Sequence, residues 1–280
     1  MQKKTNAELR EIATQGRMMA LKMVYKAASG HIGGSLSCMD ILTELYFNIM
    51  NIDPTVPSME ERDRLVMSKG HCSPGLYSIL ALRGFFPKEK LDEFRQLRGH
   101  LSGHVEMRHV PGVDMSTGSL GQGLSAAVGM ALAGKFKKQN YRVYSILGDG
   151  ELEEGQIWEA LMSAAKYGLD NLCVIVDVNG LQIDGPTKNV MPMEPLADKF
   201  TAFGCSVIET DGHNFDTLEK AFRAARDVRG RPAAILAHTV KGKGISFMEN
   251  KVGWHGKAPK EEEYLQAMAE LTAALTRAEV

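Results

Sequence analysis

The chain has 280 residues, with 33 Lys and Arg against 34 Asp and Glu and a formal net charge of −1. This balance argues against a nucleic-acid-binding protein, which normally carries a basic excess. Hydrophobic residues make up 44% and charged residues 24%, a composition that excludes a disordered chain. No apolar run approaches the roughly 20 residues that span a bilayer, and the polar N-terminus has no signal-peptide apolar region.

The four cysteines, Cys38, Cys72, Cys173 and Cys205, are scattered along the chain and form no CxxC pair. Neither a disulfide framework nor a structural zinc site is expected from this spacing. We expect a soluble cytoplasmic protein that makes no contact with nucleic acid or membrane. Because the sequence contains no internal repeat and no Pro/Ser-rich linker, we expect residues 1–280 to form a single domain.

The first part of the chain is predicted to be helical. Apolar residues recur at helical spacing over 7–29, and a second helix is predicted over 38–50, ending before Pro54. The glycine-rich stretch 117–123 opens a further predicted helix over 124–138. A glycine-rich loop at a helix N-terminus can bind an anion, but its small residues can equally serve close helix packing.

The second half shows the clearest architecture, because apolar strands alternate with helical patterns. Strands are predicted at 141–147, 171–178, 205–209 and 233–237, and helices between them at 155–167 and 216–227. A strand, a helix and a strand in this order make a βαβ unit, whose strands are parallel. Continuous apolar strands are buried on both faces. The fold prediction is therefore α/β, a doubly wound parallel sheet with helices on both sides.

Two polar residues follow neighbouring predicted strands. Asp149, inside the GDG sequence 148–150, and Asn179 lie at strand carboxyl ends, where sheets of this kind bind ligands. A carboxylate and a carbonyl oxygen suit Mg²⁺ or Ca²⁺ better than zinc, and Mg²⁺ commonly shares its remaining ligands with phosphates. A lone GDG is more often only a tight turn than a ligand-binding site. Asn179 at the end of the second strand makes a turn without a ligand less favoured.

A dinucleotide-binding site is not expected at this turn. Its fingerprint requires GxGxxG directly after a strand, whereas 148–150 is followed by Glu151, Leu152 and Glu153. The acidic residues of the loop would repel a pyrophosphate unless a metal bridged the carboxylate and the phosphates.

Five of the eight histidines directly follow a glycine, namely His31, His71, His100, His104 and His213. With 28 glycines in 280 residues, chance predicts about one such pair. Any one of these histidines alone is more often a surface or capping residue than a catalytic one. As a set they favour a polar, histidine-lined cleft for sugar hydroxyls or phosphates, and they lack the HxxxH-type spacing of a metal site.

Taken together, seven motifs resemble the N-terminal part of a transketolase, a thiamine-diphosphate enzyme. The GDG-to-Asn spacing is typical of thiamine-diphosphate enzymes in general, whereas GSLGQG and GDGELEEGQIWEA are more specific for transketolase and its relatives. The motifs run in order along nearly the whole chain: SGHIGG (29–34), SKGHCSPGLYS (68–78), SGHVEM (102–107), STGSLGQGLSAAVGMA (116–131), GDGELEEGQIWEA (148–160), DVNGLQIDG (177–185) and TVKGKG (239–244), followed by His255.

The resemblance implies thiamine diphosphate as cofactor, with Mg²⁺, or alternatively Ca²⁺ or Mn²⁺, held by Asp149, Asn179 and the backbone carbonyl of Leu181. It implies further cofactor contacts at the diphosphate end and at the thiazolium and aminopyrimidine rings, from His31, His71, Gly118, Ser119, Leu120, Gly150, Lys241 and His255. It also implies catalytic roles for three histidines that line the substrate channel, bind sugar oxygens and help to move protons: His31, His104 and His255.

Some positions matched by the resemblance carry less weight. Glu154 and Glu159 match acidic residues at the family's subunit interface, although a solvated helix face explains Glu159 equally well. Ile32 replaces the proline that is frequent in the family after the first Gly-His pair, and Gly34 is an added glycine. These two departures lie near the expected cofactor and should change local shape, not chemistry.

The resemblance covers only the diphosphate-binding part of a transketolase, which as a single chain is more than twice this long. It implies that the pyrimidine-binding domain, with the glutamate that activates the aminopyrimidine, belongs to a second polypeptide. We expect two copies of each chain, together transferring a two-carbon ketol unit from a ketose phosphate to an aldose phosphate. The alternatives are a ketol transferase acting on a sulfo- or branched sugar, and a non-catalytic regulatory homologue.

Overall fold

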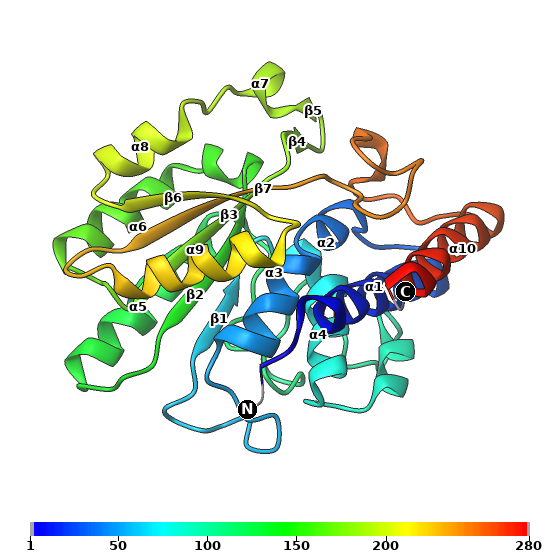
Figure 1. The fold of residues 1–280 in the computed structure, drawn as a ribbon, viewed down its shortest axis with the longest axis horizontal. Coiled ribbons are helices and arrows are strands. Elements are labelled where there is room, and N and C mark those ends of the chain that lie inside the picture. Colours follow the sequence, from blue (N-terminus) through cyan, green and yellow to red (C-terminus); the bar gives the residue numbers. More distant parts are fainter. Residues whose placement is uncertain (1–2, 279–280) are drawn as a thin grey trace.

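Parallel strands form a five-stranded sheet in the order β1-β2-β3-β7-β6 (Figure 1). The protein is described here by a computed structural model covering residues 3–278. The strands of the sheet are β1 (Arg64–Met67), β2 (Val143–Gly148), β3 (Leu172–Val178), β6 (Ser206–Asp211) and β7 (Ala233–His238), and a separate antiparallel pair comprises β4 (Leu181–Gln182) and β5 (Gly185–Pro186).

Helices cover both faces of this sheet (Figure 1). The α-helices are α1 (Asn6–Lys26), α2 (Gly33–Ser37), α3 (Met39–Glu44), α4 (Ser73–Arg83), α5 (Gln122–Phe136), α6 (Gly155–Lys166), α7 (Thr187–Val190), α8 (Leu196–Ala202), α9 (Phe215–Asp227) and α10 (Glu261–Ala278). Short 3-10 or π turns are η1 (Leu45–Ile49), η2 (Gly70–Cys72), η3 (Lys88–Glu93), η4 (Gly150–Glu153) and η5 (Val252–Trp254). None of the helices within residues 3–278 is long and apolar enough to cross a membrane.

The central strand β3 shows why the sheet needs cover on both sides. Cys173 and Ile175 pack into the cluster formed with α1, α3, α4 and α9, whereas Val174 and Val176 pack into the cluster formed with α5, α6 and α8. Successive side chains of a strand point to opposite faces, so both sets are apolar. The prediction of a doubly wound parallel sheet is confirmed.

The predicted helices and strands correspond to α1, α3 with η1, α5, α6, α9, β2, β3, β6 and β7, with ends displaced by a few residues. The edge strand β1 and the C-terminal helix α10 were not predicted from the sequence. β1 has only four residues, too few for a periodic pattern. α10 packs along α1, where Tyr264 stacks on Tyr25 with ring centroids 4.1 Å apart (Figure 1).

Strand β1 is anchored by a buried ion pair. The Arg62 guanidinium donates to both oxygens of Asp114, at 2.5 and 3.1 Å, and the two side chains are 6% and 5% exposed. Asp114 also accepts the Leu65 backbone N–H at 2.8 Å, which holds the edge strand in register. The pair therefore ties the loop before α5 to the strand that leads into the 68–78 segment.

We expect Arg62→Ala to destabilise the protein because it leaves the buried Asp114 with only the more distant Arg64, at 3.8 Å, as a cationic partner. Burial raises the pKa of Asp114, so the carboxyl can take up a proton when the arginine is removed. The expected loss is therefore about 3 kcal/mol of unfolding free energy, at the lower end for a broken buried pair, measured by urea denaturation. Lys4→Ala, which breaks an exposed pair with Glu8, serves as the control and should leave the free energy of unfolding nearly unchanged. Equal effects of the two substitutions would contradict this account of β1.

Candidate active site

The carboxyl ends of four neighbouring strands open onto a cavity of about 340 Å³. Lys69 follows β1, Asp149 follows β2, Asn179 follows β3 and Lys241 follows β7. Parallel strands bring their carboxyl ends to one edge of the sheet, which is where an open α/β sheet binds its ligand. The topology alone therefore gathers two acidic or amide oxygens and two ammonium groups in one place.

Four histidines line the same cavity, and His31 lies close to the other three. The ring centroid of His31 lies 5.2 Å from His71, 5.7 Å from His104 and 5.5 Å from His255. Three of these four follow a glycine, as the sequence pattern suggested, and His255 joins them from the segment after η5. The prediction that all five histidines that follow a glycine line one cleft was wrong, because the other two lie elsewhere.

Those two histidines do not line the cavity. His100 lies in an exposed loop, with its ring 5.5 Å from that of His109. His213 is part of a separate buried network with Asp40. A glycine before a histidine indicates a turn, and turns occur at both ends of the sheet and in surface loops, so the pattern alone does not locate the ring.

The cavity lowers the pKa values of three of its histidines, His31, His104 and His255. Burial, together with nearby His71, lowers the pKa of His31 to about 4. Burial, reinforced by the Lys241 ammonium, lowers the pKa of His255 to about 3, and burial lowers that of His104. The Nδ1 atoms of His31 and His255 are buried and have no hydrogen-bond partner within residues 3–278. These rings can accept or donate a hydrogen bond to a polar ligand.

Asp149 is a buried carboxylate, 6% exposed, at the start of η4. It accepts the backbone N–H groups of Gly150 at 3.0 Å and Gly180 at 2.5 Å. Burial, with the Asp177 carboxylate nearby, raises the pKa of Asp149 to about 6, while the two N–H groups act in the opposite direction. A cation beside this group would stabilise its charged form.

Two further oxygens complete the set predicted as metal ligands. The Asn179 Oδ1 accepts the Leu181 backbone N–H at 3.1 Å, and its Nδ2 donates to Asp177 at 3.3 Å. The Leu181 carbonyl accepts the Lys241 ammonium at 3.0 Å. Carboxylate, amide and carbonyl oxygens on the wall of one cavity are the donor types that Mg²⁺ and Ca²⁺ prefer. No group of three or more His, Cys, Asp or Glu side chains in the described part of the chain could hold a metal.

The remaining predicted residues are mostly brought together. Gly118, Leu120 and Gly150 line the cavity. A Cβ on Gly150 would lie 2.9 Å from Cβ of Gln182, so a larger residue would close this wall. Ser119, in contrast, is exposed and is not among the residues that line the cavity.

The two glutamates matched to the family's interface lie on the outside of this region. Glu154 borders the cavity at the N-terminus of α6, and Glu159 is exposed on the same helix.

A buried ion pair beneath the cavity was not predicted from the sequence. The Lys69 ammonium, 2% exposed, donates to the fully buried Asp177 carboxylate, which also accepts the Thr239 hydroxyl. Burial acts to lower the pKa of Lys69, but the Asp177 carboxylate and neighbouring sulfurs hold it well above its usual range. Both residues belong to quoted motifs, at 68–78 and 177–185, so their position in those motifs was the available signal.

Glu151 is a second residue of the cavity wall whose contacts were not predicted, because the sequence pattern presented it only as part of an acidic loop. Its side chain turns inward, is 2% exposed, and accepts the Gly121 N–H at 3.0 Å and the Gly148 N–H at 3.1 Å. It also accepts the Ser68 hydroxyl. One carboxylate thus joins three loops around the cavity. Glu151, Glu153 and Glu154 all line the cavity, but the Glu151 charge is already shared by these three protein donors, so it repels an anion less than the loop composition suggests.

A larger hollow of about 570 Å³ lies elsewhere, between residues 47–52 and α9. Its charged side chains pair with one another, since Glu219 binds both Lys3 and Arg223. It gathers none of the histidine or oxygen groups described above, so we assign the chemistry to the smaller cavity.

Comparison with known proteins agrees with this geometry. Residues 9–274 match the family described as "Transketolase, thiamine diphosphate binding domain". Relatives include a 6-deoxy-6-sulfo-D-fructose transketolase subunit from Clostridium sp. strain MSTE9, 48% identical over 94% of this chain and 96% of the relative. Another is an apulose-4-phosphate transketolase subunit from Phocaeicola vulgatus, 44% identical over 95% of this chain and 94% of the relative.

Among solved structures, a transketolase from Campylobacter jejuni superimposes with a TM-score of 0.90 and 33% identity, covering 98% of this chain and 46% of that chain. The chain belongs to the transketolase family, as its N-terminal, thiamine-diphosphate-binding domain. Both the resemblance and the expected cofactor class are therefore confirmed.

The depressed pKa values give a testable pH dependence. His31 and His255 should stay neutral in the folded state down to about pH 4 and about pH 3, whereas an unfolded histidine protonates near 6.5. Between these values the unfolded chain binds more protons, so the free energy of unfolding should fall as the pH is lowered from 6.5 towards 4. Following the histidine C–H resonances by NMR as the pH is lowered measures the two pKa values directly, with His31→Asn and His255→Asn used to assign the resonances. Protonation of both rings near pH 6.5 would contradict it.

Proposed function

We propose that this chain is the diphosphate-binding subunit of a two-polypeptide transketolase. It transfers a two-carbon ketol unit from a ketose phosphate to an aldose phosphate, with thiamine diphosphate and a divalent metal. One observation carries the proposal: a single cavity in a transketolase-family chain collects three oxygen ligands, two buried lysines and four histidines. In the proposed enzyme, residues 1–280 form a single domain.

Asp149, Asn179 Oδ1 and the Leu181 carbonyl are the proposed metal ligands, with Mg²⁺ as the preferred ion and Ca²⁺ or Mn²⁺ as alternatives. A metal at the Leu181 carbonyl would replace the Lys241 ammonium that this carbonyl now accepts. Lys241 would then be free to bind a phosphate oxygen, together with His71, His255 and the Gly150 backbone. The positive charges of the metal and of Lys241 offset the acidic loop.

When bound, thiamine diphosphate supplies a thiazolium ring that stabilises the negative charge formed as a ketose C–C bond breaks. His31, His104 and His255 orient the sugar by hydrogen bonds to its oxygens and exchange protons with them. Their lowered pKa values keep these rings neutral at pH 7, so each has one donor and one acceptor nitrogen for this purpose. Gly118, Ser119 and Leu120 form the proposed loop beside the cofactor rings.

A partner polypeptide supplies the pyrimidine-binding domain and its activating glutamate. The support is that two relatives of matching length are named as transketolase subunits, whereas the chain spans 46% of the Campylobacter enzyme. The proposed assembly contains two copies of each polypeptide, with Glu154 and Glu159 at the interface.

A second candidate keeps the reaction and changes the sugar. The two relatives above, at 48% and 44% identity, are named for 6-deoxy-6-sulfo-D-fructose and for apulose 4-phosphate. This favours a modified sugar as the substrate of this chain too. The non-catalytic alternative receives no support, because every predicted oxygen, lysine and histidine position is occupied by the required residue and faces or borders one cavity.

Asp149→Ala should abolish Mg²⁺-dependent binding of thiamine diphosphate, because it removes the only carboxylate among the proposed ligands. Calorimetric titration of the assembled complex with cofactor, with and without Mg²⁺, measures the effect. Lys137→Ala, at an exposed position after α5, is the control and should bind as the unaltered protein does. Unchanged affinity in the Asp149 variant would remove the metal assignment.

The chain alone should show no more than trace ketol transfer, and activity should appear when the partner subunit is added. A coupled assay with sugar phosphates, sulfofructose and a branched sugar phosphate as donors would identify the substrate class. Strong activity of the isolated chain would contradict the two-polypeptide proposal.

A further inference from the structure

Lys241 lies in a segment whose backbone is held at several points. Directly after β7, the Thr239 N–H donates to the Val178 carbonyl at 3.0 Å, and the Gly242 N–H donates to the Gly33 carbonyl at 3.0 Å. Between these two bonds the Val240 N–H donates to Nε2 of His213 at 2.8 Å. A side chain from the loop after the neighbouring edge strand thus holds the peptide next to Lys241.

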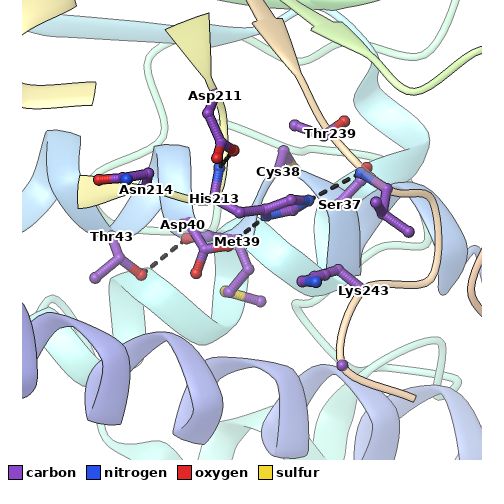
Figure 2. A network of polar contacts seen from close by, with 12 residues as sticks. Ser37, Cys38, Met39, Asp40, Thr43, Asp211, His213, Asn214, Thr239 and Lys243 are labelled. Carbon is purple, nitrogen blue, oxygen red and sulfur yellow. Dashed lines mark hydrogen bonds and ion pairs between the residues drawn. The ribbon is translucent and has the colours of Figure 1, made fainter. Parts of the chain in front are cut away.

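His213 is itself fixed on its other side. Its Nδ1 lies 2.7 Å from Oδ2 of Asp40, and its backbone N–H donates to Asp211 at 2.8 Å. Figure 2 shows the ring between Asp40 on α3 and the chain that leaves β7. Because the Val240 N–H can only donate, Nε2 must be the acceptor and the proton must be on Nδ1, directed at the Asp40 carboxylate.

Asp40 in turn is held by α1. The Arg17 guanidinium donates to both Asp40 oxygens, at 3.0 and 2.6 Å, and the two side chains are 8% and 7% exposed. Burial acts to raise the pKa of Asp40, but Arg17 and His213 outweigh it and hold the pKa below its usual value. The carboxylate is therefore a fixed, charged acceptor. An unbroken chain of contacts runs from Arg17 through Asp40 and His213 to the Val240 peptide.

We propose that His213 is a positioning residue for the cofactor site: it fixes the Val240 peptide and so directs the Lys241 ammonium at the diphosphate. This rests on the proposed function, in which Lys241 binds the diphosphate. His213 does not line the cavity and touches no reacting group, so its effect passes entirely through the backbone. Arg17 and Asp40 contribute by holding the ring in the Nδ1–H form.

Two substitutions separate the two ring contacts. In His213→Asn the amide can take the place of Nδ1 and still donate to Asp40, but nothing remains to accept the Val240 N–H. In His213→Gln the longer side chain can place its carbonyl oxygen near the Nε2 position and accept that N–H. We expect His213→Asn to raise the dissociation constant for thiamine diphosphate with Mg²⁺ about tenfold, because the released Val240 peptide and the Lys241 side chain must then be ordered when the cofactor binds. His213→Gln should recover most of the lost affinity.

A double-mutant cycle with Lys241→Met tests whether the effect passes through the lysine. In the Lys241→Met background, His213→Asn should weaken cofactor binding no further. A partly buried histidine that only stabilises the fold would instead have the same effect on the affinity in both backgrounds. The complex with its partner subunit is titrated by calorimetry, and urea denaturation monitors folding. Unchanged affinity in His213→Asn, or full additivity with Lys241→Met, would overturn the inference.

If the unaltered complex binds no thiamine diphosphate, the proposed function itself is defeated. Two measurements that need no cofactor still test the role of His213 in that case, and also if His213→Asn fails to fold. Amide hydrogen exchange at Val240 should be at least about tenfold faster in Asp40→Asn, which loosens the His213 ring, than in the unaltered protein. The ¹⁵N shifts of His213 in the unaltered protein should show a protonated Nδ1 and an unprotonated acceptor Nε2. Unchanged exchange at Val240, or a proton on Nε2, would overturn the inference without any cofactor present.

Discussion

The Asp177 carboxylate is the interaction on which the candidate site depends. It is fully buried, and it accepts the Lys69 ammonium, the Ser37 and Thr239 hydroxyls and the Asn179 amide. These partners come from the segment after β1, from α2, from the segment after β7 and from the end of β3 itself. A charge buried in this way is tolerated only when it is paired and hydrogen-bonded. Four segments of the cavity wall are therefore fixed relative to one another before any ligand binds.

Charge is arranged around this point in layers. The Lys69–Asp177 pair lies beneath the cavity, Glu151 is turned into the loop backbone, and Asp149 and Lys241 remain on the wall. The Glu151 carboxylate is thus occupied by protein donors, Glu153 and Glu154 also line the cavity, and Asp149 is the carboxylate that shares the wall with the Asn179 and Leu181 oxygens. His31 and His255, whose pKa values are lowered, line the same cavity and offer hydrogen bonds rather than charge. The His213 network extends the same principle to the backbone beside Lys241.

Much of this could be predicted from residues alone, for identifiable reasons. Asp149 and Asn179 follow strands with continuous apolar runs, so their meeting at one sheet edge follows from parallel topology. The inward turn of Glu151 could not be predicted, because composition gives the charge of a loop and not the direction of its side chains. His213 shares the Gly-His pattern with His31, yet lies in a different network, since its position depends on β6 occupying the sheet edge beyond β7. β1 was missed because four residues show no period.

The most direct measurement is a crystal structure of this chain with its partner subunit, grown with thiamine diphosphate and Mn²⁺, whose anomalous signal locates the metal. The account predicts one metal peak bonded to Asp149, Asn179 Oδ1 and the Leu181 carbonyl, with the diphosphate on its open side and the Lys241 ammonium moved from Leu181 to a phosphate oxygen. A cofactor bound with its metal away from these three oxygens, or a cavity that stays empty while the complex is active, would contradict it.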